Sequence, residues 1–92
     1  MTRYIVVGRT MHESARVLNY FLSLFGKIVT HYNSKTRTVQ IGDCVFKFSC
    51  YELYERYDKL GSLNDVVIPA YVMERDLDIY RITLNKKKEE TE

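Results

Sequence analysis

The stretch YIVVGRTMHESARVL, residues 4–18, carries the residue types in this chain whose order could perform chemistry. A short β-branched run leads through Gly8 into a segment with helical periodicity. A helix that begins directly after a glycine can bind phosphate, because its first backbone N–H groups are unpaired and its dipole is positive at that end. A working phosphate loop also needs a lysine that reaches the β- and γ-phosphates and a hydroxyl that holds Mg²⁺.

The segment resembles the phosphate loop of large terminase ATPases, the packaging motors of phages, and of related viral P-loop ATPases. Gly8 and Arg9 match the Gly-Arg of that family, and Ser14 matches its hydroxyl residue. His12 stands in place of the second glycine, and Glu13 stands in place of the lysine. A glutamate there turns attraction for phosphate into repulsion, about 4 kcal/mol for unit charges about 4 Å apart near a protein surface.

A second similarity to these ATPases lies downstream. Residues 61–68, GSLNDVVI, look like the strand that carries the two catalytic acids of the family, but Pro69 and Ala70 stand in place of those acids. The hairpin sequence TVQIGDCVFKFS, residues 38–49, is similar to the strands between the two motifs. The resemblance implies an ATPase-like core of phage or mobile-element origin that lacks the lysine and the acids, so we expect no hydrolysis.

Thr10-x-x-Glu13 predicts a capping box. The Thr10 hydroxyl would accept the N–H of Glu13, and the Glu13 carboxylate would accept the N–H of Thr10. Such a cap contributes roughly 1 kcal/mol, and an acidic residue in the first turn also favours the helix dipole. We therefore predict a self-capped helix start. Binding of a nucleotide or phosphate without hydrolysis stays open as an alternative.

The other polar residues predict no catalytic, metal or cofactor site. His12 and His31 are far apart in the sequence and lie outside any Cys/His/Asp cluster. Glu74, Asp76 and Asp78 lie near Arg75 and Arg81, which predicts a solvated, charge-balanced loop. The two cysteines match no zinc signature and are expected to be reduced, buried thiols of an intracellular protein: Cys44 and Cys50.

Apolar and aromatic residues predict a surface for protein contact. The segment 11–25 is apolar around most of its circumference, and tyrosines recur every third residue in 51–57. Tyrosine is enriched at protein interfaces. We expect self-association or binding of a host or viral factor, with these contact residues: Val17, Tyr20, Leu24, Tyr51 and Tyr54.

Basic residues in the middle of the chain offer a second hypothesis. Cations with neighbouring aromatic residues can hold single-stranded nucleic acid. The candidate contacts of a nucleic-acid-binding module are Lys27, Lys35, Arg37 and Lys47.

Periodicity predicts a small α/β domain with a mixed sheet. The expected order is β-α-β-β-β-α-β-(β), with strands at 3–8, 27–32, 36–41, 44–48, 65–68 and 79–84 and helices at 11–25 and 51–60. A strand-helix-strand start predicts a right-handed crossover with a parallel pair. Gly42-Asp43 predicts a tight hairpin turn, and Ser49-x-x-Glu52 predicts a second capping box.

Length and charge limit the function classes. The 92 residues make one domain, residues 1–85, with a charged tail, residues 86–92, that we expect to be disordered. The net charge of +2 is too small to indicate nucleic acid or an anionic membrane by itself. We find neither a membrane span nor a signal peptide and expect a cytoplasmic location. The sequence thus predicts a small non-catalytic protein that acts by contact, without a cofactor.

Overall fold

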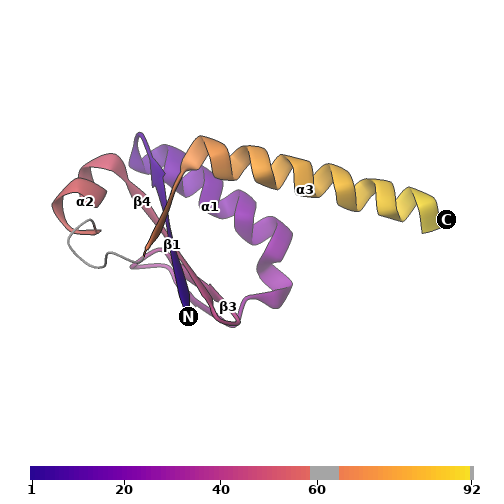
Figure 1. The fold of residues 1–92 in the computed structure, drawn as a ribbon, viewed down its shortest axis with the longest axis horizontal. Helices are drawn as coiled ribbons and strands as arrows, with labels where there is room; N and C mark the ends of the chain where they lie inside the picture. Colours follow the sequence, from indigo (N-terminus) through magenta and orange to yellow (C-terminus); the bar gives the residue numbers. More distant parts are fainter. Residues whose placement is uncertain (59–64, 92) are drawn as a thin grey trace.

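In the computed structural model, which describes residues 1–58 and 65–91, a five-stranded mixed sheet has helices on both faces (Figure 1). The predicted α/β class with a mixed sheet is confirmed. The elements in chain order are β1 (Thr2–Gly8), α1 (Met11–Phe25), the 3₁₀ turn η1 (Gly26–Ile28), β2 (His31–Asn33), β3 (Thr38–Ile41), β4 (Cys44–Cys50), α2 (Tyr51–Arg56), β5 (Val66–Pro69) and α3 (Ala70–Thr91).

The sheet has the order β2-β3-β4-β1-β5. The central strand, β1, runs parallel to both neighbours, β4 and β5. The other pairs, β2 with β3 and β3 with β4, are antiparallel. The predicted hairpin is confirmed, because Ile41 pairs with Cys44 and Gly42 adopts a φ of 55° in the turn between them. Glycine tolerates this left-handed conformation.

The predicted strand at 27–32 and its crossover onto β1 are wrong. Residues 26–28 continue the end of α1 as a 3₁₀ turn, and β2 begins only at His31. All three residues of β2 are exposed, so this polar strand lies at the edge of the sheet remote from β5. The parallel partners of β1 are instead the later apolar strands β4 and β5, which can be covered on both faces.

The predicted last strand at 79–84 and the disordered tail are replaced by α3, which runs through both segments to Thr91. Ala70, Met73 and Leu77 are buried at helical spacing, and no glycine or proline follows Pro69. The acidic residues near Asp76 therefore lie on a helix and not in a loop. The C-terminal half of α3 projects beyond the sheet (Figure 1).

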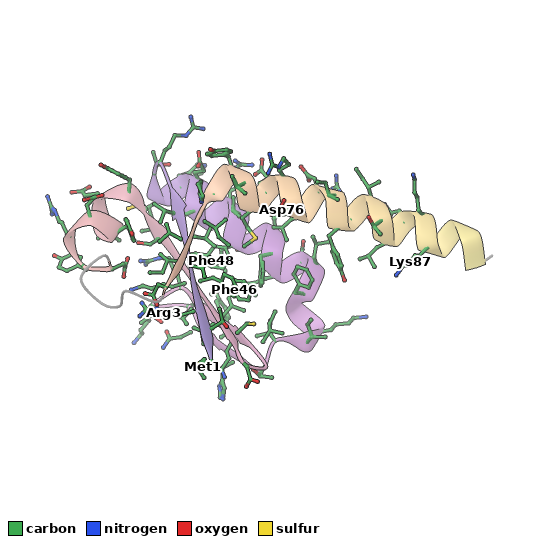
Figure 2. All side chains as sticks on the ribbon, viewed as in Figure 1. Met1, Arg3, Phe46, Phe48, Asp76 and Lys87 are labelled. Atoms are coloured by element: carbon green, nitrogen blue, oxygen red, sulfur yellow. The ribbon has the colours of Figure 1, made fainter. Side chains whose placement is uncertain are left out.

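The core lies between the sheet and the pair α1 and α3. Val6 and Phe48 lie at paired positions of β1 and β4, and both are fully buried. Phe48 is labelled in Figure 2 together with its neighbour Phe46. The Phe21 ring of α1 packs on two phenylalanines of β4, with its centroid 5.0 Å from that of Phe46 and 5.5 Å from that of Phe48. Burial of these apolar side chains is the main favourable term of folding.

The end of α2 is fixed to the opposite face of the sheet. Lys47 and Ser49 alternate with Phe46 and Phe48 along β4, so they point away from α1 and α3. Asp58, two residues after α2, binds both of them. The predicted capping box at Ser49 is wrong, because Cys50 is the N-cap residue and the Ser49 hydroxyl donates to Asp58. The predicted helix to residue 60 ends at Arg56, and residues 59–60 lie outside the described ranges.

Candidate functional site

The candidate site lies where the parallel strands end. β1 and β4 are parallel neighbours, yet the helices that follow them, α1 and α2, lead toward opposite faces of the sheet. In open α/β sheets, ligands bind outside the carboxyl ends of the strands at such a switch of direction. Gly8 pairs with Cys50 at this edge, so the starts of α1 and α2 lie side by side.

A hollow of about 410 Å³ opens at this edge, between α2 and the strands β1 and β5. Its size falls in the usual range of ligand pockets. The hollow is mainly apolar, and its described lining residues are Val7, Gly8, Arg9, Tyr51, Tyr54, Val67 and Pro69.

Two of the predicted contact residues meet in this hollow. Tyr51 is 61% exposed and Tyr54 is half-buried, so both offer surface to a partner. Val7, Val67 and Pro69 complete the wall, and sequence reasoning missed all three. No local sequence pattern could indicate that these residues meet, because β5 pairs with β1 across about sixty residues of chain.

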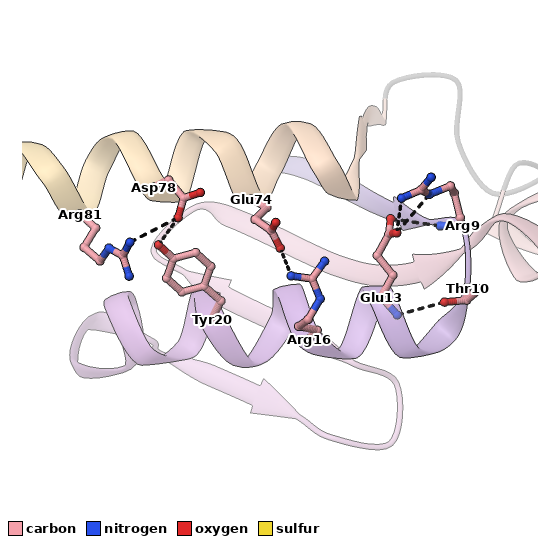
Figure 3. Close-up of polar contacts among 8 residues, drawn as sticks. All are labelled: Arg9, Thr10, Glu13, Arg16, Tyr20, Glu74, Asp78 and Arg81. Atoms are coloured by element: carbon pink, nitrogen blue, oxygen red, sulfur yellow. Dashed lines mark hydrogen bonds and ion pairs between the residues drawn. The ribbon is translucent and has the colours of Figure 1, made fainter.

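The loop that resembles a phosphate cradle is closed by its own carboxylate. The backbone N–H of Glu13 donates to Thr10 Oγ1 at 3.1 Å, as the first half of the predicted capping box requires (Figure 3). The second half differs, because the Glu13 carboxylate accepts from the Arg9 N–H at 3.4 Å and from Arg9 Nε at 3.2 Å and not from Thr10. A negative charge therefore already lies at the helix N-terminus, where it would repel an anion.

Replacement of Thr10 with alanine tests this cap. We expect Thr10→Ala to lower the free energy of unfolding by about 1 kcal/mol, because the N–H of Glu13 loses its acceptor. Urea denaturation measures the change. A suitable control is Thr83→Ala on the exposed part of α3, where the hydroxyl only donates to the Ile79 carbonyl within the helix and alanine is a better helix former. Equal losses in the two variants would contradict the cap.

The contact residues predicted on α1 are covered by α3. Val17 is fully buried, so its prediction as a contact residue is wrong, and Leu24 packs half-buried against the core. The Tyr20 hydroxyl donates to Asp78 Oδ1 at 2.5 Å, and the Arg81 guanidinium lies 5.6 Å from the ring centroid (Figure 3). The hydrogen bond to Asp78 and, to a smaller extent, burial raise the pKa of Tyr20. The apolar surface of α1 is therefore covered by α3, a helix of the same chain, and does not require a partner protein.

The predicted nucleic-acid contacts do not form one free basic surface. Lys47 pairs with Asp58 at 2.5 Å, and Arg37 Nε donates to the Phe48 carbonyl at 3.0 Å. Lys27 is exposed in η1, and Lys35 is exposed in the turn after β2. Two of the four side chains therefore serve internal contacts of the fold.

Metal-binding clusters and membrane spans are both absent from the described ranges 1–58 and 65–91. In these ranges no group of three or more His, Cys, Asp or Glu side chains could hold a metal ion. No helix there is long and apolar enough to cross a membrane. His12 and His31 are exposed on separate elements, whereas the thiol residues are half-buried (Cys44) and buried (Cys50).

No family model, curated protein or solved structure matches this chain.

Proposed function

We propose that this protein is a non-catalytic binding module whose contact surface is the hollow between α2 and β5. The observation that carries the proposal is the meeting of Tyr51 and Tyr54 with exposed apolar strand residues at the switch of helix direction. Tyrosine-lined pockets are frequent centres of binding energy at protein interfaces. The partner expected here is a protein that inserts an apolar side chain into the hollow.

The chemistry of the lining supports contact over catalysis. Among its described members, Arg9 is the sole charged residue, and its guanidinium is paired with Glu13 at 3.1 Å. Each tyrosine offers a large apolar ring and a polar hydroxyl at its tip, a combination that suits recognition of a protein surface. The similarity of the loop to viral packaging ATPases is our ground for proposing a phage or mobile-element origin and a role in the host cytoplasm.

The two alternative functions have less support. Nucleotide or phosphate binding at residues 8–14 would require the Glu13 carboxylate to leave the helix N-terminus. Nucleic-acid binding would rest mainly on Lys27 and Lys35, because Arg37 and Lys47 are engaged within the fold.

Affinity capture from the natural host cell tests the proposal. The double variant Tyr51→Ala, Tyr54→Ala should reduce capture of the partner at least tenfold, because hot-spot tyrosines each contribute more than about 1 kcal/mol. The matched control is the double variant Tyr57→Ala, Tyr71→Ala, whose tyrosines are at least as exposed as Tyr51 and Tyr54 but lie outside the described hollow lining. Thermal melts should show that both variants fold. A partner captured equally well by both variants would contradict the proposed surface.

A further inference from the structure

The edge strand β5 has the composition of an interior strand. Its four residues are Val66, Val67, Ile68 and Pro69, and within the described ranges it has a neighbour, β1, on one side only. Val66 is 44% exposed and Val67 is 43% exposed, although they point to opposite faces. Strands with such continuous apolar runs are normally covered on both faces.

The two edge strands of the sheet, β2 and β5, differ in composition. The opposite edge, β2, has three residues, His31, Tyr32 and Asn33. Short and polar edge strands of this kind are a usual protection against pairing with another chain. Apart from Pro69 at its last position, β5 lacks this protection, so among the residues that the structure describes nothing pairs with its outer edge, and a further strand can add there.

We propose that β5 pairs, antiparallel and across a two-fold axis, with β5 of a second copy of this chain. The two five-stranded sheets would then form one continuous sheet. The inference extends the proposed function of binding by contact to a second surface, which shares only Val67 and Pro69 with the hollow.

The position of α3 fits this two-fold pairing. Strands in a sheet are about 4.8 Å apart, so the axis would lie about 2.4 Å outside β5. α3 follows β5 directly and contacts both β1 and β5. We therefore place it above the gap between these two strands, one further half-spacing away from the proposed axis. Its copy would therefore lie about 10 Å away and antiparallel, which is the normal distance between packed helices.

The side of α3 that would face its copy is the side turned away from α1. Glu74 and Asp78 mark the side toward α1, because they bind Arg16 and Tyr20 (Figure 3). At 100° per residue, the opposite side carries Val72, Asp76, Ile79 and Thr83. Ile79 is 57% exposed, so a copy of α3 on this side would remove a large apolar side chain from water.

The residues near the axis are complementary to themselves. In the antiparallel arrangement, Val72 of one copy lies opposite Ile79 of the other, and both apolar side chains become covered. Asp76 lies on this side between them, and Arg75 precedes it with its guanidinium 4.0 Å from the Asp76 carboxylate. Asp76 of one copy can therefore meet the oppositely charged Arg75 of the other across the axis.

A second copy explains more than an isolated peptide strand would. Four paired residues alone are far below the roughly 800 Å² per partner that stable interfaces bury. A peptide would also leave Ile79 exposed. The second copy presents a strand that is followed by a helix, and it covers both exposed features with one symmetry operation.

The mass of the full chain in solution tests the inference. Light scattering during size exclusion at tens of micromolar should give twice the chain mass of 10.9 kDa. Val66→Lys on the strand and Ile79→Lys on the helix should each weaken dimerisation at least tenfold. The matched control is Ile82→Lys, which is equally exposed on α3 but lies closer to the α1 side, and it should leave the dimer intact.

Two results would overturn the inference: a wild-type chain that remains a monomer at several hundred micromolar, or a dimer that survives both Val66→Lys and Ile79→Lys. Far-UV circular dichroism should establish that each lysine variant folds. The proposed function is tested independently of this inference. A monomeric chain whose partner capture still depends on Tyr51 and Tyr54 would end the two-fold pairing and leave the hollow as the contact surface.

Discussion

Replacement of Gly8 with alanine should lower the free energy of unfolding by about 3 kcal/mol. A Cβ atom at this position would lie 2.8 Å from the Thr10 carbonyl oxygen and 2.9 Å from the Ser14 backbone nitrogen. Both are backbone atoms at the start of α1, so the clash cannot be relieved by a side-chain rotation. The helix would have to move away from β1, which would disturb both the cap and the hollow.

A second glycine provides the control for this prediction. Gly26, at the end of α1, has a φ of −52°, and a Cβ atom added there would have no atom of the described part of the chain within 4 Å beyond its immediate neighbours. Gly26→Ala should therefore leave stability unchanged or raise it by up to about 1 kcal/mol, because alanine restricts the unfolded chain. Urea denaturation compares the two variants. A Gly8→Ala protein as stable as Gly26→Ala would contradict the close approach of helix and strand.

Removal of the Asp58 carboxylate is the second large change. Asp58 accepts from Lys47 at 2.5 Å and from Ser49 at 2.7 Å, and its side chain is 4% exposed. Asp58→Ala leaves the buried Ser49 hydroxyl and the mostly buried Lys47 without their partner. Such losses cost about 3 kcal/mol at neutral pH. Because Asp58 fixes the end of α2 to the sheet, the variant should also weaken partner capture by the hollow.

An exposed ion pair in the same helix is the matched control. Glu52 and Arg56 lie 3.1 Å apart in α2, and both side chains are about two-thirds exposed. Glu52→Ala should change stability by less than about 0.5 kcal/mol, because solvent screens the pair. Similar losses in Asp58→Ala and Glu52→Ala, measured by urea denaturation at pH 7, would show that the Asp58 contacts contribute no more than a surface pair.

The Asp58 contribution should also depend on pH. Burial alone would raise the pKa of Asp58, but the hydrogen bonds from Lys47 and Ser49 and the charges of Lys47 and Arg3 outweigh it, so the pKa is lowered. The native state therefore binds the proton less readily than the unfolded state, whose pKa is about 3.9. The stability difference between wild type and Asp58→Ala should be constant from about pH 5 to 8 and shrink below about pH 4. An equal difference at pH 7 and pH 3 would contradict this assignment.

Local signals were sufficient for much of the fold. The apolar run of β1, the Thr10 cap, the helix end at Phe25, the Gly42 turn and the strand before Ala70 all depend on residues close together in the chain. The spacing of Tyr51 and Tyr54 likewise predicted a shared face, and the structure leaves Tyr51 exposed and Tyr54 half-buried in one hollow.

Local patterns failed where two structures fit the same residues. Tyr80, Ile82 and Leu84 alternate like a strand, but three positions are too few to exclude a helix. Tertiary packing favours a helix, α3, because Ala70, Met73 and Leu77 can be buried against α1 and the sheet only at helical spacing. The same packing buried Val17, and Asp58 drew the Ser49 hydroxyl away from the helix start.

The sequence by itself determined the α/β class, the self-capped start of α1 and the two tyrosines of the candidate site, since each follows from neighbouring residues. The tertiary structure alone decided that β5 pairs with β1, and hence that Val7, Val67 and Pro69 join those tyrosines in one hollow. Pairing between distant strands depends on how apolar faces are buried across the whole sheet. Short-range periodicity therefore does not indicate which strands become neighbours.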